Sequence, residues 1–286
     1  MDEKLVTLSN TEQHLISSDI VNDQFKISIA LPKNYADTQQ TYPVVFVLDA
    51  NIFFGLVTET ARLLQFGGQI VECIIVGVGY PDDAQHMALR CRDYTPTPDD
   101  EGNQAWLNKI SQGQKVPIEY KGSGKAAQFL AFLRRELRPY IQEQYRITPN
   151  DTTLVGDSMG GLFAMYTLFH QPETFKRYIV GSPSLYHEDN LTFDYEAAYA
   201  AAHDDLPATV FLSVGALEAI FEPAFAAMVS NVARMTEILT SRKYPGLELT
   251  THIFDNETHH SVIPATMSRG LRTVFAEYDR RHSQDL

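Results

Sequence analysis

The chain has 286 residues, 44% of them hydrophobic, which is enough to bury one large core, so we expect a single domain over 1–286. Lys and Arg number 23 against 36 Asp and Glu, which gives a formal net charge of -13. This acidic balance argues against nucleic-acid binding, and no apolar run approaches the roughly 20 residues that a membrane-spanning helix needs.

The start of the chain and its two cysteines favour a cytoplasmic location. Residues 1–7 lack the basic start and the apolar core of a signal peptide. Cys73 lies in an apolar run and Cys91 lies between two arginines. A disulfide between them stays open, but a reduced pair is the simpler interpretation.

An alternation of apolar strands and amphipathic helices predicts an α/β fold. Expected strands are two antiparallel ones within 4–32, then Tyr42–Ala50, Cys73–Tyr80, Thr152–Val155, Tyr178–Pro183, Ala208–Gly215 and Leu247–Phe254. Expected helices are Asn51–Phe66, Ala126–Tyr145, Leu162–Leu168, Phe221–Thr240 and Pro264–Tyr278. This order is typical of a mostly parallel sheet with helices on both faces.

Two stretches show no such pattern. Residues 81–122 carry the only tryptophan, Trp106, and little periodicity, and loops this long tend to be lids or binding loops. We therefore expect this insertion to be a loop at the rim of the active site, or a lid over it. A disordered surface insertion is the alternative, although the aromatic content argues against it. Residues 186–205, which are acidic and rich in tyrosine, form a second excursion.

The stretch Thr152–Gly161 carries the motif around which the chemistry is organised. Its residues 156–160, Gly-Asp-Ser-Met-Gly, fit the G-x-S-x-G nucleophile elbow between a buried strand and a buried helix. In an elbow the neighbours of the serine are small because strand and helix nearly touch. The alternative is an ordinary Gly-Ser turn. We expect Ser158 to stand at the carboxyl end of the sheet as a nucleophile.

The residues that follow later strands supply partners for this serine. A serine hydroxyl needs a base, a neutral imidazole suits that role near pH 7, and a carboxylate holds the imidazole in place. Glu218 comes three residues after one strand, and His259 and His260 follow the last strand. The order serine, acid, histidine is that of α/β-hydrolases, so Ser158, Glu218 and one of these histidines form the predicted triad.

Several alternatives remain at this point. His260 competes equally with His259 as the base. Asp204, Asp205 and Glu222 compete with Glu218, which could also be a carboxylate placed at a helix start. The cluster of Asp255, Glu257, His259 and His260 offers metal ligands, but it lacks the spacing of helical zinc sites and a cysteine partner, so we expect no metal and no cofactor.

Stabilisation of an oxyanion requires two N–H donors. In this fold they come from the residue after the nucleophile and from the loop after the third strand. We expect Met159 as the first and Asn51 as the second, with Ile52 as the alternative. Aromatic residues near these positions, Phe53, Phe54, Tyr94 and Tyr186, are candidate walls of a substrate pocket.

Four motifs in this order resemble one family. They are Gly-Asp-Ser-Met-Gly-Gly from 156, Gly-Ser-Pro-Ser from 181, Val-Gly-Ala-Leu-Glu from 214 and Glu-Thr-His-His-Ser-Val-Ile-Pro from 257. Together they look like the "putative esterase" family of the α/β-hydrolase superfamily, with esterase D and the enterochelin-type siderophore esterases. The resemblance covers about Phe25 to Phe275.

The resemblance implies roles for individual residues. It favours His259 over His260 as the base, supports Glu218, and suggests that Arg92 and Asp93 brace or line the site, with a structural ion pair as the more ordinary role. The chain departs from many relatives in Leu-Asp-Ala at 48–50, where they carry His-Gly, and in Tyr186, where they carry Trp.

These residues together predict a serine carboxylesterase that forms an acyl-enzyme on small to medium acyl esters. A siderophore esterase or an S-formylglutathione-type thioesterase with the same triad is the alternative, and a non-catalytic binding protein on a hydrolase scaffold is a third. The expected partner is a small-molecule ester. The sequence does not determine the oligomeric state, and a homodimer stays open.

Overall fold

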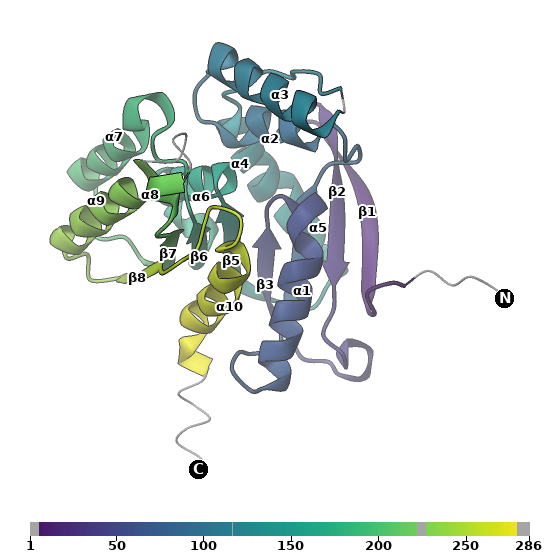
Figure 1. Ribbon diagram of the computed structural model, residues 1–286. Coiled ribbons are helices and arrows are strands. Elements are labelled where there is room, and N and C mark those ends of the chain that lie inside the picture. The colour runs from purple at the N-terminus through teal and green to yellow at the C-terminus, as the bar shows by residue number, and fades with distance from the viewer. Residues whose placement is uncertain (1–5, 116, 222–226, 279–286) are drawn as a thin grey trace.

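The computed structural model describes residues 6–115, 117–221 and 227–278, and an eight-stranded sheet runs through its centre (Figure 1). The strands are β1 (Thr11–Ser18), β2 (Asp23–Ala30), β3 (Tyr42–Val47), β4 (Ile74–Gly79), β5 (Ile147–Asp157), β6 (Arg177–Gly181), β7 (Ala208–Gly215) and β8 (Leu247–Phe254). Their order across the sheet is β1-β2-β4-β3-β5-β6-β7-β8.

The sheet is antiparallel at one end and parallel over the rest. β1 pairs with β2 and β2 with β4 in antiparallel register, whereas all pairs from β4 through β8 are parallel. The predicted early antiparallel strands and the mostly parallel sheet are confirmed. Every residue of β3, β4 and β6 is buried, which explains their continuous apolar runs, because such strands are covered on both faces.

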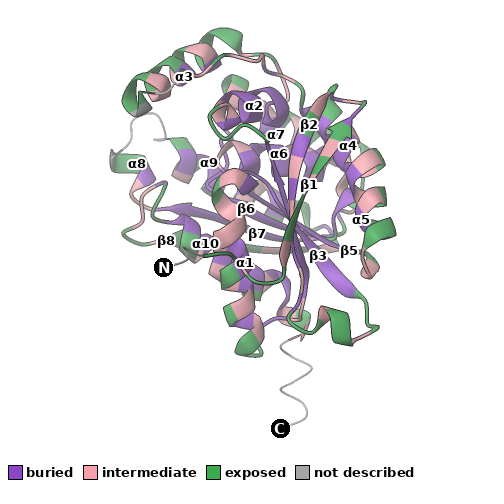
Figure 2. Ribbon diagram, turned by 90° about the vertical axis from the view of Figure 1, so that its right-hand side faces the viewer, coloured by how far each residue is buried: buried purple, intermediate pink, exposed green. Residues whose placement is uncertain are grey.

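Helices cover both faces of this sheet (Figures 1 and 2). They are α1 (Ala50–Phe66), α2 (His86–Tyr94), α3 (Asp100–Gln114), α4 (Ala126–Phe132), α5 (Arg138–Gln144), α6 (Met159–His170), α7 (His187–Ala202), α8 (Glu218–Phe221), α9 (Ala227–Arg242) and α10 (Ile263–Val274). Single turns add η1 (Tyr35–Asp37), the π-helical η2 (Leu133–Leu137) and η3 (Pro172–Thr174).

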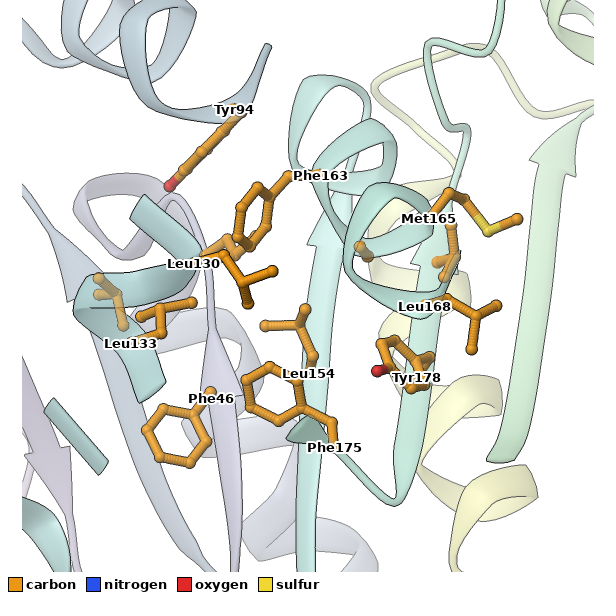
Figure 3. Packing of buried hydrophobic residues seen from close by; sticks show 14 of the residues in the cluster. Phe46, Tyr94, Leu130, Leu133, Leu154, Phe163, Met165, Leu168, Phe175 and Tyr178 are labelled. Carbon is orange, nitrogen blue, oxygen red and sulfur yellow. The ribbon is translucent and has the colours of Figure 1, made fainter. Parts of the chain in front are cut away.

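Two apolar cores result, one on each face. α1 and α10 pack on each other and bury the smaller core against the sheet. α4, α6 and α9 lie over the larger core, part of which is shown in Figure 3. Phe46 of β3, Leu154 of β5 and Phe163 of α6 belong to this larger core and are at most 1% exposed. α6 therefore lies across the middle of the sheet, with its first residue directly after β5.

The prediction of a loop over 81–122 is wrong, because this stretch contains α2 and α3. α2 is buried along nearly its whole length and packs on α6, and α3 lies outside it (Figure 1). Asp99 caps α3 by accepting a hydrogen bond from the Gly102 N–H. The apolar periodicity that marks most helices is missing from α2 because its buried positions include charged residues.

Three further expectations are modified. The excursion at 186–205 contains α7, which is kinked where Glu188, Asp189 and Asn190 are left-handed. The helix expected over Ala126–Tyr145 forms as α4, η2 and α5. Pro139 lacks the N–H that an α-helical bond would use, which accounts for the π-helical turn. Of the helix expected over Phe221–Thr240, the described part is α9 (Ala227–Arg242); Phe221 ends α8, and 222–226 lie outside the described residues.

The structure also describes the state of the two cysteines and the length of the helices. Cys73 and Cys91 are both buried and are not bridged to each other. Across the described ranges, none of the helices combines the length and the apolar character that crossing a bilayer requires.

Candidate active site

Ser158 lies in a strained turn between β5 and α6. Its φ is 58° and its ψ is -117°, a region that residues other than glycine rarely adopt. A Cβ atom at Gly156 would collide with the carbonyl oxygen of Gly160, and one at Gly161 would lie 2.8 Å from the Gly181 oxygen. The two glycines are therefore required by the close approach of strand and helix, as expected for a nucleophile elbow.

A histidine and a carboxylate meet at the same edge of the sheet. His259 lies between β8 and α10 and is 5% exposed, and its Nδ1 is 2.8 Å from Glu218 Oε2. Glu218 is the first residue of α8 and is fully buried. His260 is exposed, with its ring perpendicular to that of His259. Of the two histidines, His259 is the one that contacts the predicted acid.

The second oxygen of Glu218 is fixed by two donors. Oε1 accepts hydrogen bonds from the Ser182 hydroxyl at 2.6 Å and from the Gly215 N–H at 2.8 Å. The carboxylate is thus satisfied on both oxygens, as a buried charge must be, and Oε2 is aimed at the imidazole. Of the other acids considered, Asp205 accepts from the backbone N–H groups of Leu206 and Gly246, and Glu222 lies outside the described residues.

Asp157, the residue before the nucleophile, is a buried carboxyl group without a hydrogen bond at Oδ1. Burial raises the pKa of Asp157 to about 7, and the nearby His259 opposes this increase. The imidazole therefore lies within electrostatic reach of the elbow. A hydrogen bond between the Ser158 hydroxyl and the imidazole is part of the reaction proposed below.

The two residues expected to donate to an oxyanion are the first of α6 and the second of α1. Met159 follows Ser158 directly, and its half-buried side chain packs between the large core and α2. Asn51 uses its side chain to bond the backbone of Tyr80, with Nδ2 donating to the oxygen and Oδ1 accepting from the N–H, both at 2.8 Å. The second hydrogen of Nδ2 is donated to Asp83 Oδ1, so only the backbone N–H of Asn51 can serve as a donor. The N–H of Ile52 already donates to Asp49 O.

Asp49, at the turn between β3 and α1, is the centre of a buried polar cluster. Arg90 of α2 donates to both of its carboxylate oxygens, at 2.8 and 2.9 Å, and His86 Nε2 lies 2.9 Å from Oδ1. Burial opposes the charge of Asp49, but Arg90 and His86 outweigh it and lower the pKa of Asp49 to about 2. The carboxylate is thus ionised at neutral pH.

The aromatic residues expected to line a pocket are distributed differently. Phe53 and Phe54 pack against the core under α1 and α10, and the Phe54 ring lies where a Cβ at Gly77 would be. Tyr94 is fully buried beside Phe163, at the upper end of the cluster in Figure 3, so it is not a pocket wall in this structure. Tyr186 is 37% exposed and follows Ser184, whose N–H donates to Ser158 O.

Arg92 and Asp93 form a buried ion pair. Arg92 donates to both oxygens of Asp93, at 2.7 and 2.9 Å, and also to Asp23. The Tyr80 hydroxyl donates to Asp93 Oδ2 at 3.1 Å. This is the structural ion pair that the sequence suggested for these two residues, and it lies on a different side of α2 from Arg90.

Sequence reasoning missed Asp49, His86, Arg90 and Ser182. The spacing of His86, Arg90 and Tyr94, four residues apart each time, was an available signal, because it places all three side chains on one face of a helix. Ser182 directly follows a buried strand, like the other polar residues of this edge, and could have been found by the same rule that selected Glu218.

Comparisons with known proteins identify the family of this chain. The family described as "Putative esterase" matches residues 18–263. The ferri-bacillibactin esterase BesA of Bacillus subtilis is 30% identical over 272 residues, covering 93% of this chain and 90% of that protein. The siderophore triacetylfusarinine C esterase of Aspergillus fumigatus is 26% identical over 302 residues, covering 96% of each.

Solved structures show the same fold. The BES protein from Bacillus cereus has a TM-score of 0.79 at 30% identity and covers 96% of this chain and 98% of its own. The siderophore hydrolase EstB from Aspergillus nidulans has a TM-score of 0.78 at 21% identity, with the same coverage. From its sequence match and its fold, the chain belongs to the "Putative esterase" family and is a carboxylic ester hydrolase with the α/β-hydrolase fold.

Proposed function

We propose that this protein hydrolyses siderophore-type esters through an acyl-enzyme on Ser158. The observation that carries the catalytic part is the 2.8 Å contact of His259 Nδ1 with the buried Glu218, at the same sheet edge as the left-handed Ser158. The substrate class is supported by the two relatives from Bacillus subtilis and Aspergillus fumigatus, which are named as siderophore esterases and match more than nine tenths of this chain.

In the first half-reaction His259 Nε2 takes the proton of the Ser158 hydroxyl while Oγ attacks the ester carbonyl. Glu218 accepts the Nδ1–H, so that it holds the imidazole in the required tautomer and stabilises the imidazolium. The tetrahedral oxyanion accepts hydrogen bonds from the Met159 N–H and from the first turn of α1. Loss of one such donor typically lowers kcat by about 10²- to 10³-fold.

Collapse of this intermediate breaks the bond to the leaving alkoxide, which receives the proton from His259 Nε2. Water then attacks the acyl-Ser158 ester, again with His259 as base, and releases the carboxylic acid and the free enzyme. The reaction needs no oxidant, reductant or cofactor.

Small to medium acyl esters, the first expectation from the sequence, become the secondary candidate. That expectation depended on four aromatic residues as pocket walls, and Tyr94, Phe53 and Phe54 pack in the cores instead. Tyr186 remains as a wall candidate next to the elbow.

The test combines one variant with a panel of esters. We expect Ser158→Ala to lose hydrolysis of p-nitrophenyl acetate by about 10⁴-fold or more without a change in Tm, and to lose labelling by a fluorophosphonate probe. For the wild type we expect a higher kcat/KM on a catecholate trilactone or a hydroxamate ester siderophore than on p-nitrophenyl acetate or an acyl glutathione. Equal labelling of Ser158→Ala would refute the nucleophile, and preference for the simple ester would refute the substrate class.

A further inference from the structure

Three buried side chains on one face of α2 form hydrogen bonds with the same residue, Asp49. His86, Arg90 and Tyr94 are 2%, 6% and 0% exposed, and all three bind Asp49. Arg90 and His86 bind its carboxylate, and the Asp49 backbone N–H donates to the Tyr94 hydroxyl at 3.1 Å. Three buried polar side chains therefore hold one turn, the turn from β3 into α1.

These contacts change what Asp49 does at the start of α1. An aspartate in this position usually accepts hydrogen bonds from the first N–H groups of its helix. Here Asp49 makes no such bond, because both oxygens are taken by α2. The N–H groups of Ile52 and Phe53 donate to Asp49 O, whereas those of Ala50 and Asn51 have no acceptor among the described residues.

The turn is also tied to the nucleophile elbow. The Leu48 N–H donates to Val155 O of β5, and a Cβ at Gly160 would lie 3.2 Å from Asp49 Oδ2. The side chain of Asn51 is fixed to the backbone of Tyr80 on the other side. The first turn of α1 is thus restrained next to the first turn of α6.

We propose that His86, Arg90 and Tyr94 are positioning residues that, through Asp49, fix the N–H groups of Ala50 and Asn51 where they meet the reacting carbonyl oxygen. The inference rests on the proposed function and extends it to the role of α2. Donors fixed in advance are effective because they need no rearrangement in the transition state. A displacement of about 1 Å can lower the rate about 10²-fold.

The chain offers two matched pairs of variants. Tyr94→Phe and Tyr80→Phe each remove one buried hydroxyl with a 3.1 Å hydrogen bond, but the Tyr80 hydroxyl binds Asp93 instead of the turn. Arg90→Met and Arg92→Met each break a buried bidentate ion pair, and Arg92 binds Asp93 and Asp23. Within each pair the loss of stability should be similar, and only the connection to Asp49 differs.

Two kinetic readouts separate positioning from folding. With a p-nitrophenyl ester, we expect Tyr94→Phe and Arg90→Met to lower kcat about 10- to 100-fold with KM changed less than about twofold, because the ground state does not use the donors. A trifluoromethyl ketone forms an oxyanion on Ser158, so its Ki should rise by the same factor as kcat falls. Tyr80→Phe and Arg92→Met should keep both values, and Arg90→Lys should recover part of the loss.

The controls decide between the possible failures. Fluorophosphonate titration of the wild type comes first, and absence of labelling at Ser158 would overturn the proposed function and with it this inference. If the wild type is labelled and active but both members of each pair lose kcat equally, the function stands and the positioning role is wrong. Should Arg90→Met fail to fold, Tyr94→Phe decides alone, since it removes only one oxygen atom.

Discussion

The two ends of the parallel strands carry polar clusters of opposite character. At the amino ends Arg177, 1% exposed, binds Asp151 and Glu277, and its guanidinium lies 4.7 Å from the centre of the Phe275 ring. Tyr278 donates to the other oxygen of Asp151 at 2.9 Å. Every charge in this cluster has a partner.

At the carboxyl ends, three backbone turns and one buried carboxyl group are held in less favourable states. Asp157 is buried with an oxygen that has no hydrogen bond. Ser158 and Ser182, directly after β5 and β6, and Asp49, two residues after β3, have positive φ angles. The residue with positive φ near the amino ends of β3 and β5 is Asn150, a type that tolerates this conformation. Strained turns and a buried carboxyl oxygen without a hydrogen bond occur at the edge where chemistry is proposed, whereas the charges of the Arg177 cluster at the opposite edge are all paired.

The largest expected difference between the two edges concerns one glutamate at each. Glu218→Gln should lower kcat about 10⁴-fold with little change in Tm, because the amide no longer holds His259 in the required tautomer. Glu277→Gln, which weakens the pairs with Arg177 and Lys176 at the opposite edge, should leave kcat unchanged. Steady-state kinetics with a p-nitrophenyl ester measures both, and a similar loss in the two variants would remove the functional distinction between the edges.

The next effect is on stability alone. Arg177→Met leaves the buried Asp151 without its cation and Glu277 with Lys176 alone, so the free energy of unfolding should fall by about 3 to 5 kcal/mol. Urea denaturation monitored by circular dichroism measures this change. The kcat measured well below the Tm should stay at the wild-type value, and a drop in kcat in fully folded protein would contradict the assignment of this cluster to stability.

Asp157 gives a pH-dependent effect of intermediate size. Its pKa of about 7 in the folded state exceeds the value near 3.9 in the unfolded chain, so the folded state binds more protons between these values. Its contribution to stability therefore falls as pH rises from about 4 to 7, and the penalty is complete above pH 7. Asp157→Asn, which mimics the neutral acid, should raise the free energy of unfolding at pH 8 by about 2 to 4 kcal/mol and change it little at pH 4.

Asp151→Asn at the opposite edge is the matched control, since it weakens the bonds from Arg177 and should lower stability at pH 8. Urea denaturation at pH 4, 6 and 8 compares the two variants. If Asp157→Asn lost stability at pH 8, the ionised Asp157 would stabilise the fold, as Asp151 does. The two carboxylates would then not differ in their effect on stability.

Local patterns in the sequence predicted much of the fold and the residues of the proposed triad. Continuous apolar runs identified β3, β4 and β6 because both faces of these strands are covered. Glu218 and the neighbours His259 and His260 could be found because residues after parallel strands meet at one edge, and the chain order of α/β-hydrolases suggested their proposed roles. The family resemblance then favoured His259 over His260. The contact between Glu218 and His259 follows from the parallel pairing of β7 and β8, and the alternation of strands and helices predicted such a parallel sheet.

The polar interior could not be predicted in the same way. A search for apolar periodicity overlooks α2 because that helix buries His86, Arg90 and Asp93. Aromatic content suggested Phe53, Phe54 and Tyr94 as pocket walls, but composition does not give the direction of a side chain. The kink at Glu188, Asp189 and Asn190 was also invisible, since no glycine marks it.

The smallest expected effect concerns the left-handed residue at the amino edge. Asn150, φ 60°, is exposed at the irregular pairing of β3 with β5, and an alanine there should lower the free energy of unfolding by about 1 to 2 kcal/mol. Asn150→Gly removes the steric conflict and should stay within about 0.5 kcal/mol of the wild type. Because this turn lies far from the triad along the strands, kcat should be the same in both variants. If kcat fell together with the free energy of unfolding in Asn150→Ala, strain at the amino edge would be coupled to the carboxyl edge through β5. The two edges would then not have separate roles.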